Sequence, residues 1–298
     1  MADRHHWARA AMGGLALLAC TLTASAQPAQ RDIFNGQFGA MEIALPPREA
    51  AAQADLMRDA LAALPPQTPG QMDIYILSAA FWGEPVFERE ASHAAEILEE
   101  HFGANAHSIV LTLGAGANPG ERRYPMASPN NLQATIGKIG SLIDPAEDLV
   151  VLFLTSHGSQ DGSVSVLQQN RLASSLRPAH LRDALSNAGI RNRVVIVSAC
   201  FSGAFIAPLM DANTIVLTAA APDRTSFGCQ PSREWTYFGD AYFNTALRNG
   251  AGIVAGFDQA TALISRWERE QNLTPPSNPQ KYVGANAAAM VTRAERRR

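Results

Sequence analysis

The sequence predicts a doubly wound α/β domain, in which a mostly parallel sheet is flanked by helices. Two apolar runs, 149–154 and 194–197, consist of β-branched and aliphatic residues without alternation, which is typical of parallel strands covered on both faces. The linker of about forty residues between them is long enough for a helical crossover, so the two strands are expected to be neighbours. From Met72 onward, strand-like and helix-like segments alternate, as they do in a single α/β domain.

The individual elements follow from periodicity and from stop signals. A helix is expected over 49–64, ended by the proline-rich stretch 65–70. Asn130 or Asn131 is expected to cap the helix over 130–143. Regular structure is expected to end at Pro275, Pro276 and Pro279, before a solvated charged tail. The remaining strands are predicted over 72–80, 107–113, 163–167 and 214–219, and the remaining helices over 87–102, 130–143, 178–187, 235–247 and 255–272.

Composition limits the classes of function. The 298 residues are 47% apolar and 17% charged with a net charge of -3, which suits one globular core and neither nucleic-acid binding nor disorder. The three cysteines, Cys20, Cys200 and Cys229, are too few for a disulfide framework. Since no CxxC or HExxH motif occurs, no metal site is expected.

The amino terminus reads as an export signal. Arg4 and Arg9 precede an apolar segment, 10–20, that is too short to span a bilayer, and Ala24-Ser25-Ala26 has the pattern of a cleavage site. The mature chain is therefore expected to begin near Gln27 and to be periplasmic or secreted. A competing cut before Cys20 resembles a bacterial lipoprotein box and would leave a lipid anchor on that cysteine. No later segment is a transmembrane candidate.

Both apolar runs end on residues capable of covalent chemistry. Since the carboxyl ends of neighbouring parallel strands open on the same side of a sheet, His157 and Cys200 are expected to face each other. A thiol activated by a nearby imidazole is the nucleophile of acyl transfer. The backbone N–H groups of Gly158 and Cys200 could hold the developing oxyanion. The alternative is a buried structural cysteine beside a capping histidine.

These motifs resemble those of a known family. Residues 156–158 and 198–203 are similar to the His-Gly and Ala-Cys-x-Ser-Gly motifs of the legumain-like cysteine peptidases, family C13 of the caspase-fold clan. Segments 218–229 and 236–240 also resemble this family, and the likeness covers about 72–249.

The resemblance implies a caspase-like, six-stranded sheet with Cys200 as nucleophile and His157 as its partner. It also implies endopeptidase or transpeptidase activity on a protein or peptide substrate, with no cofactor. Legumains carry an acid before the histidine and another two residues before the cysteine, where this chain has Ser156 and Ser198. The acid before the cysteine lines the pocket for asparagine in that family, so Ser198 is a candidate substrate contact and asparagine specificity is not implied.

Two further residues are candidate substrate contacts. Arg89 stands near the place of a family arginine in the loop after the first strand, while the histidine-orienting asparagine that precedes it there has no counterpart. Asp223 lies in the segment that resembles the pocket-forming loop, with a solvated loop carboxylate as the alternative. Cys229 continues that segment and is expected to be a pocket-wall residue that leaves Cys200 free; the alternative is a reversible disulfide latch between the two.

The sequence thus predicts an exported cysteine endopeptidase that hydrolyses or transfers peptide bonds. Residues 1–26 are expected to form a signal peptide, 27–70 an amino-terminal extension, 71–274 the peptidase domain and 275–298 a carboxy-terminal tail. The alternative from another class is a noncatalytic envelope protein that uses the same fold to bind peptides or partners.

Overall fold

The structure is a computed structural model that describes residues 45–113, 124–168 and 172–296. All of these residues belong to one compact unit, Asp32–Arg298. The predicted export signal and the lipid-anchor cysteine lie outside the described residues.

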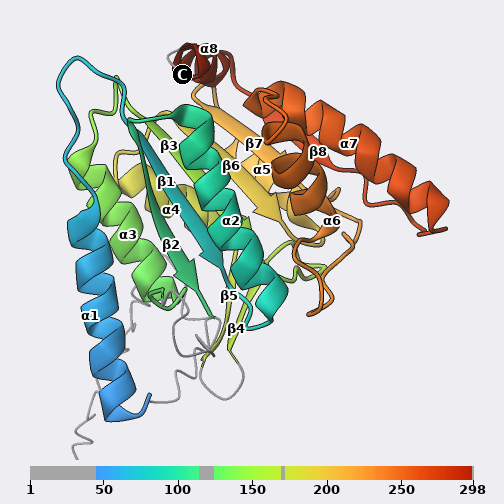
Figure 1. The fold of residues 1–298 in the computed structure, drawn as a ribbon, viewed down its shortest axis with the longest axis horizontal. Coiled ribbons are helices and arrows are strands. Elements are labelled where there is room, and N and C mark those ends of the chain that lie inside the picture. Colours follow the sequence, from blue (N-terminus) through green and yellow to red (C-terminus); the bar gives the residue numbers. More distant parts are fainter. Residues whose placement is uncertain (1–44, 114–123, 169–171, 297–298) are drawn as a thin grey trace, which may run out of the picture. The chain divides into compact units, whose positions relative to one another are not determined.

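The centre of this unit is a six-stranded sheet in the order β2-β1-β3-β6-β7-β8 (Figure 1). All neighbouring strands are parallel except the edge strand β8, which is antiparallel to β7. Strands β4 and β5 form a separate antiparallel hairpin. The strands are β1 Ile74–Ala80, β2 Ala106–Thr112, β3 Leu149–Thr155, β4 Val164–Gln168, β5 Leu172–Leu176, β6 Arg193–Ser198, β7 Thr214–Thr218 and β8 Gln280–Val283.

Helices cover both faces of the sheet, as the absence of alternation in β3 and β6 predicts (Figure 1). On one face Leu152 and Val195 pack with α1, α3 and α4, and on the other Phe153 and Ile196 pack with α2, η2, α7 and α8. The helical elements are α1 Pro47–Ala63, α2 Pro85–Phe102, α3 Pro129–Leu142, α4 Pro178–Asn187, η1 Ser202–Phe205, α5 Ile206–Leu209, α6 Tyr237–Gly239, η2 Asp240–Leu247, α7 Ile253–Glu270 and α8 Ala285–Glu295.

The pairing that positions the site is between β3 and β6. These strands are parallel neighbours, and Thr155 at the end of β3 is in register with Ser198 at the end of β6. The prediction that the two apolar runs lie side by side is confirmed. Residues 157 and 200 each follow two positions beyond this last pair, so they emerge at the same edge of the sheet.

Two local predictions are wrong, and one strand was not predicted. The cap of α3 is Ser128, whose hydroxyl accepts the Asn131 N–H at 3.2 Å, because Pro129 occupies the first helical position. The hairpin strand β5 was not predicted, since its Ala-Ser-Ser centre has low β-propensity and depends on pairing with β4. The segment 235–247 forms two short elements, α6 and the π-helical η2, rather than one α-helix.

Order also continues beyond the prolines. After Pro279 the chain adds β8 to the sheet edge and then forms α8, which buries Ala287, Val291 and Ala294 against the sheet. The expectation that regular structure ends at these prolines is therefore wrong. The prolines lie in a loop. Beyond it, the helical spacing of the apolar residues in α8 favours a helix despite the charged residues around them.

Candidate functional site

Cys200 lies in the turn that follows β6. The next residue, Phe201, adopts the left-handed conformation with φ 58° and donates its N–H to the Arg224 carbonyl at 2.7 Å. A non-glycine residue with positive φ is uncommon, and this one is held by the hydrogen bond to the loop after β7. Cys200 is followed only by η1 and the four-residue α5, whose amino end supplies less electrostatic field at the thiol than a long helix would.

Gly158 brings the end of β3 directly against Cys200. A Cβ atom at position 158 would lie 1.8 Å from the Cys200 carbonyl oxygen and 3.2 Å from its backbone nitrogen. No residue with a side chain fits there without a backbone shift. The glycine after the histidine is therefore required by the close approach of the two chain segments.

His157 is held among two aromatic rings and a carboxylate. The ring edges of Trp82 and Phe87 meet its imidazole with centroids at 4.6 and 5.1 Å. The Glu84 Oε2 atom lies 3.6 Å from His157 Nε2, and the histidine side chain is 31% exposed. The sequence analysis missed Trp82 and Glu84. Their position after the end of β1, at the same sheet edge, is the signal that could have identified them.

The thiol of Cys200 rests against Ser226. The Ser226 N–H points at the sulfur with an N–S distance of 3.3 Å, and the Ser226 carbonyl and hydroxyl oxygens are each 3.7 Å from it. The backbone N–H of Ser226 is thus a hydrogen-bond donor at the sulfur. Ser226 was not among the predicted site residues, because nothing local in the sequence places this loop over the thiol.

Cys229 lies on an apolar patch beside the site. It packs against the cluster of Val86, Phe87 and their neighbours, as does Trp82. Both Cys200 and Cys229 are free and half-buried. Burial raises the pKa of the Cys229 thiol, and the nearby charges of Cys200 and Glu84 raise it further. A protonated, apolar-packed thiol fits the expected pocket wall.

The three candidate substrate contacts have different surroundings. Arg89 donates to the carbonyl oxygens of Pro231 and Arg233 at 2.7 and 2.5 Å, so its guanidinium fastens a loop to α2. Ser198 is buried, with its hydroxyl 3.2 Å from Thr236 Oγ1. Asp223 is exposed and pairs with its neighbour Arg224. Their contact with substrate stays a prediction.

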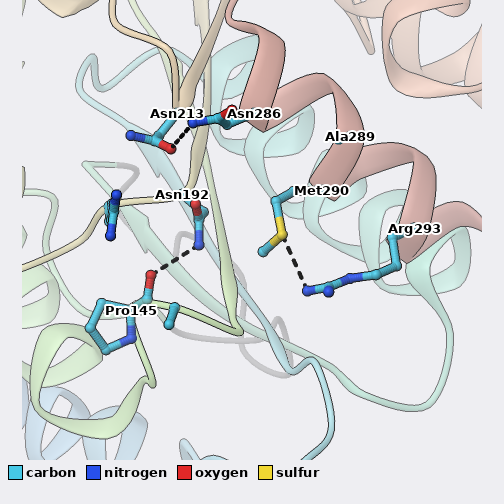
Figure 2. A pocket seen from close by; sticks show the side chains of 9 residues that line it. Pro145, Asn192, Asn213, Asn286, Ala289, Met290 and Arg293 are labelled. Atoms are coloured by element: carbon cyan, nitrogen blue, oxygen red, sulfur yellow. Dashed lines mark hydrogen bonds between the residues drawn. The ribbon is translucent and has the colours of Figure 1, made fainter.

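A cavity of about 400 Å³ lies at the opposite end of the sheet. Figure 2 shows its side chains, among them Asn192, Asn213 and Asn286, with Asn286 donating to Asn213. Because residues 192 and 213 precede β6 and β7, this cavity opens at the amino-terminal edge of the parallel strands. It shares no residue with the site around Cys200.

Residues 45–113, 124–168 and 172–296 contain no group of three side chains suited to hold a metal ion. Over the same ranges, no helix is long and apolar enough to cross a membrane.

Fold and site together define an α/β protein with a thiol and an imidazole at neighbouring strand ends, the arrangement of a cysteine peptidase. Residues 128–284, more than half of the chain and including both groups, match the family model described as the Peptidase C13 family. The chain belongs to the peptidase C13 family, and the resemblance seen in its motifs is confirmed. By family it is a cysteine peptidase that acts on protein substrates.

Two other comparisons were made. Among solved structures, caspase-1 from Spodoptera frugiperda is similar, with a TM-score of 0.48 and 10% sequence identity over 74% of this chain and 94% of that chain. Among curated proteins, no sequence matches the chain.

Proposed function

We propose that this chain is an exported cysteine endopeptidase that hydrolyses or transfers peptide bonds, with Cys200 as nucleophile and His157 as general acid and base. The observation that carries the proposal is the contact of Gly158 with the Cys200 backbone, where a Cβ would come within 1.8 Å of the carbonyl oxygen. This contact and the β3–β6 register bring His157 and the thiol of Cys200 to the same edge of the sheet.

The reaction needs only groups that this edge offers. His157 takes the proton of the Cys200 thiol, and the thiolate forms a bond to the carbonyl carbon of the substrate. The C–N bond then breaks as His157 returns the proton to the leaving amine, which leaves an acyl thioester on Cys200. Water completes hydrolysis, whereas a second amine completes transfer. Proton transfer of this kind contributes about 100- to 10,000-fold to the rate.

The oxyanion of the tetrahedral intermediate needs donors near the sulfur. We assign them to the backbone N–H groups of Gly158 and Cys200, and the close approach of these two residues supports the assignment. Removing one such donor typically costs about 3 to 4 kcal/mol of transition-state stabilisation.

Glu84 is proposed to orient His157. Its carboxylate, 3.6 Å from Nε2, favours the imidazolium that forms when the thiol loses its proton. The edges of Trp82 and Phe87 limit rotation of the ring. The family asparagine absent from the sequence is thus replaced in role by a carboxylate.

Export is proposed from the amino-terminal segment alone. Mass spectrometry of the native amino terminus should find a chain starting near Gln27, or a diacylglyceryl group on Cys20 if the lipoprotein cut is used. A protein still starting at Met1 in the cytosol would refute export without touching the peptidase proposal.

The proposal is tested with an electrophilic peptide probe that traps nucleophilic thiols. The probe should label wild type at Cys200, located by peptide mapping, and should not label Cys200→Ala. His157→Ala should label at least about 100-fold more slowly, since the thiol loses its base. Equal labelling of wild type and His157→Ala, or none of wild type, would favour the noncatalytic peptide-binding alternative.

A further inference from the structure

Glu90 is a fully buried carboxylic acid directly beneath the candidate site. It lies in α2, one turn after Phe87, and its exposed fraction is 0%. A buried carboxyl group is costly unless it is hydrogen-bonded, so its partners indicate what it does. The mechanism proposed above makes no use of it.

Two hydroxyl groups donate to the two carboxyl oxygens. Thr155 Oγ1 donates to Oε2 in a short hydrogen bond, and Thr236 Oγ1 donates to Oε1 at 2.5 Å. Thr236 is itself the cap of α6, accepting the Gly239 N–H at 3.1 Å, and its hydroxyl is 3.2 Å from that of Ser198. The carboxyl group therefore joins α2 to β3 and to α6 directly, and to β6 through Thr236.

The packing around Glu90 leaves no free space on the α6 side. A Cβ atom on Gly239 would lie 2.0 Å from Glu90 Oε1. The first turn of α6 is thus pressed against the carboxyl group, and only a glycine allows it.

The residues that Glu90 joins lie in the strands that lead to the candidate catalytic groups. Thr155 stands two residues before His157, and Ser198 two residues before Cys200, and these two are register partners at the ends of β3 and β6. Through Phe87, whose ring edge meets His157, the helix that holds Glu90 also touches the imidazole. The carboxyl group thus contacts the end of β3 directly and the end of β6 through Thr236.

We propose that Glu90 is a positioning residue of this site, which ties the strand ends that present His157 and Cys200 to helix α2 and to the cap of α6. This inference rests on the proposed function, because it concerns the geometry of the same thiol and imidazole. No substrate contact is assigned to Glu90.

The carboxyl group titrates in the neutral range. Burial raises its pKa to about 7, against a smaller lowering by the hydrogen bonds from Thr155, Thr236 and Ser198. The groups that face it from β3, β6 and α6 are hydroxyl and backbone groups. On the neighbouring elements, the charged groups pair elsewhere: Asp240 with Arg233 at 3.8 Å, Arg89 with Glu234 at 3.3 Å, and Glu84 with His157 at 3.6 Å.

The direction of the hydrogen bonds makes the ionised form the better-fitting one. A carboxylate accepts from Thr155 and Thr236 together, whereas a neutral acid or an amide must present a donor to one of them. Thr236 Oγ1 already accepts the Gly239 N–H and, because its own proton goes to Glu90, it also accepts the Ser198 hydroxyl. Both of its lone pairs are then used, so the mismatch falls on Thr155. The amide of Glu90→Gln therefore resembles the protonated carboxyl group of wild type. Because an amide does not ionise, it cannot accept from Thr155 and Thr236 together at high pH.

The experiment compares steady-state peptide cleavage by wild type, Glu90→Gln and Glu90→Leu from pH 5.5 to 8.5. The control is Glu96→Gln, an exposed glutamate on the same helix. Glu90→Leu should lower kcat on the order of 10- to 100-fold, the range expected for misplaced reacting groups, with KM changed less than about threefold. The kcat/KM of wild type divided by that of Glu90→Gln should rise with pH through about 7. The kcat/KM of wild type divided by that of Glu96→Gln should not change with pH.

A second readout does not depend on peptide cleavage. The rate of Cys200 alkylation by iodoacetamide, followed by peptide mapping, should show the same pH-dependent departure of Glu90→Gln from wild type. If wild type cleaves no peptide, the proposed function fails, and the alkylation rates still decide the role of Glu90. If Glu90→Leu does not fold, Glu90→Gln decides it. Alkylation ratios of wild type to Glu90→Gln that stay constant across the pH range would overturn the inference.

Discussion

Replacing Glu90 by glutamine should change how the stability of the protein depends on pH. The folded-state pKa of this carboxyl group is about 7 and its ordinary value is 4.5, so the folded state binds more protons than the unfolded state between these values. The free energy of unfolding of wild type therefore falls as pH rises from about 4.5 to 7. Above pH 7 this carboxyl group causes no further fall. The glutamine variant lacks this dependence.

The magnitude follows from the size of the shift. Each pKa unit corresponds to about 1.4 kcal/mol, so the rise from 4.5 to about 7 amounts to about 3 kcal/mol. Relative to wild type, Glu90→Gln should gain this amount between pH 4.5 and 7.5, on top of a constant difference from its altered hydrogen bonds. For a domain of this size the gain is a change of roughly 6 to 12 °C in the difference between the two Tm values.

Urea denaturation at several pH values, with Glu96→Gln as the exposed control, measures this difference. The Glu96→Gln curve should run parallel to that of wild type. If the stability difference between wild type and Glu90→Gln is the same at pH 4.5 and 7.5, the carboxyl group does not titrate in this range. The pH-dependent part of its assigned role would then be wrong.

Four other substitutions probe the site. Gly158→Ala should lower kcat/KM on the order of 100-fold and destabilise the fold by about 1 to 3 kcal/mol, because its Cβ would overlap the Cys200 carbonyl. Thermal melts and peptide cleavage measure these two effects. Wild-type values in both would contradict the contact between residues 158 and 200. His157→Ala should leave about 1% of turnover or less in a cleavage assay. Ser202→Ala loses only a hydrogen bond with Ala220 and should have a milder effect. The reverse order would contradict the assignment of the catalytic residues. Cys229→Ser and wild type should be equally active without reductant, because Cys229 is a wall residue, and a dormant wild type awakened by dithiothreitol would indicate a disulfide latch.

The sequence was informative where one strong pattern fixes the structure. The apolar runs of β3 and β6 predict buried parallel strands, and the approach of Gly158 to Cys200 follows from their pairing. The order after Pro279 could not be predicted in the same way, because β8 is an edge strand of four residues that exists only by pairing with β7.

The surroundings of the site were less predictable, because they depend on long-range packing. Glu84 and Glu90 are ordinary helix-start and helix-interior glutamates in the sequence, and only the fold brings one to His157 and buries the other under the strand ends. Arg89 was considered as a substrate contact, but its guanidinium also has backbone carbonyls to satisfy, which no local pattern reveals. The covering of the thiol by Ser226 likewise depends on the path of a whole loop.

Digestion of a peptide library by purified wild type and by Cys200→Ala tests the peptidase assignment most directly. Wild type should produce internal cleavages, and Cys200→Ala should produce none above the uncatalysed background, because no acyl thioester can form. Equal cleavage by the two proteins, or activity that depends on Ser202 instead, would contradict Cys200 as the nucleophile.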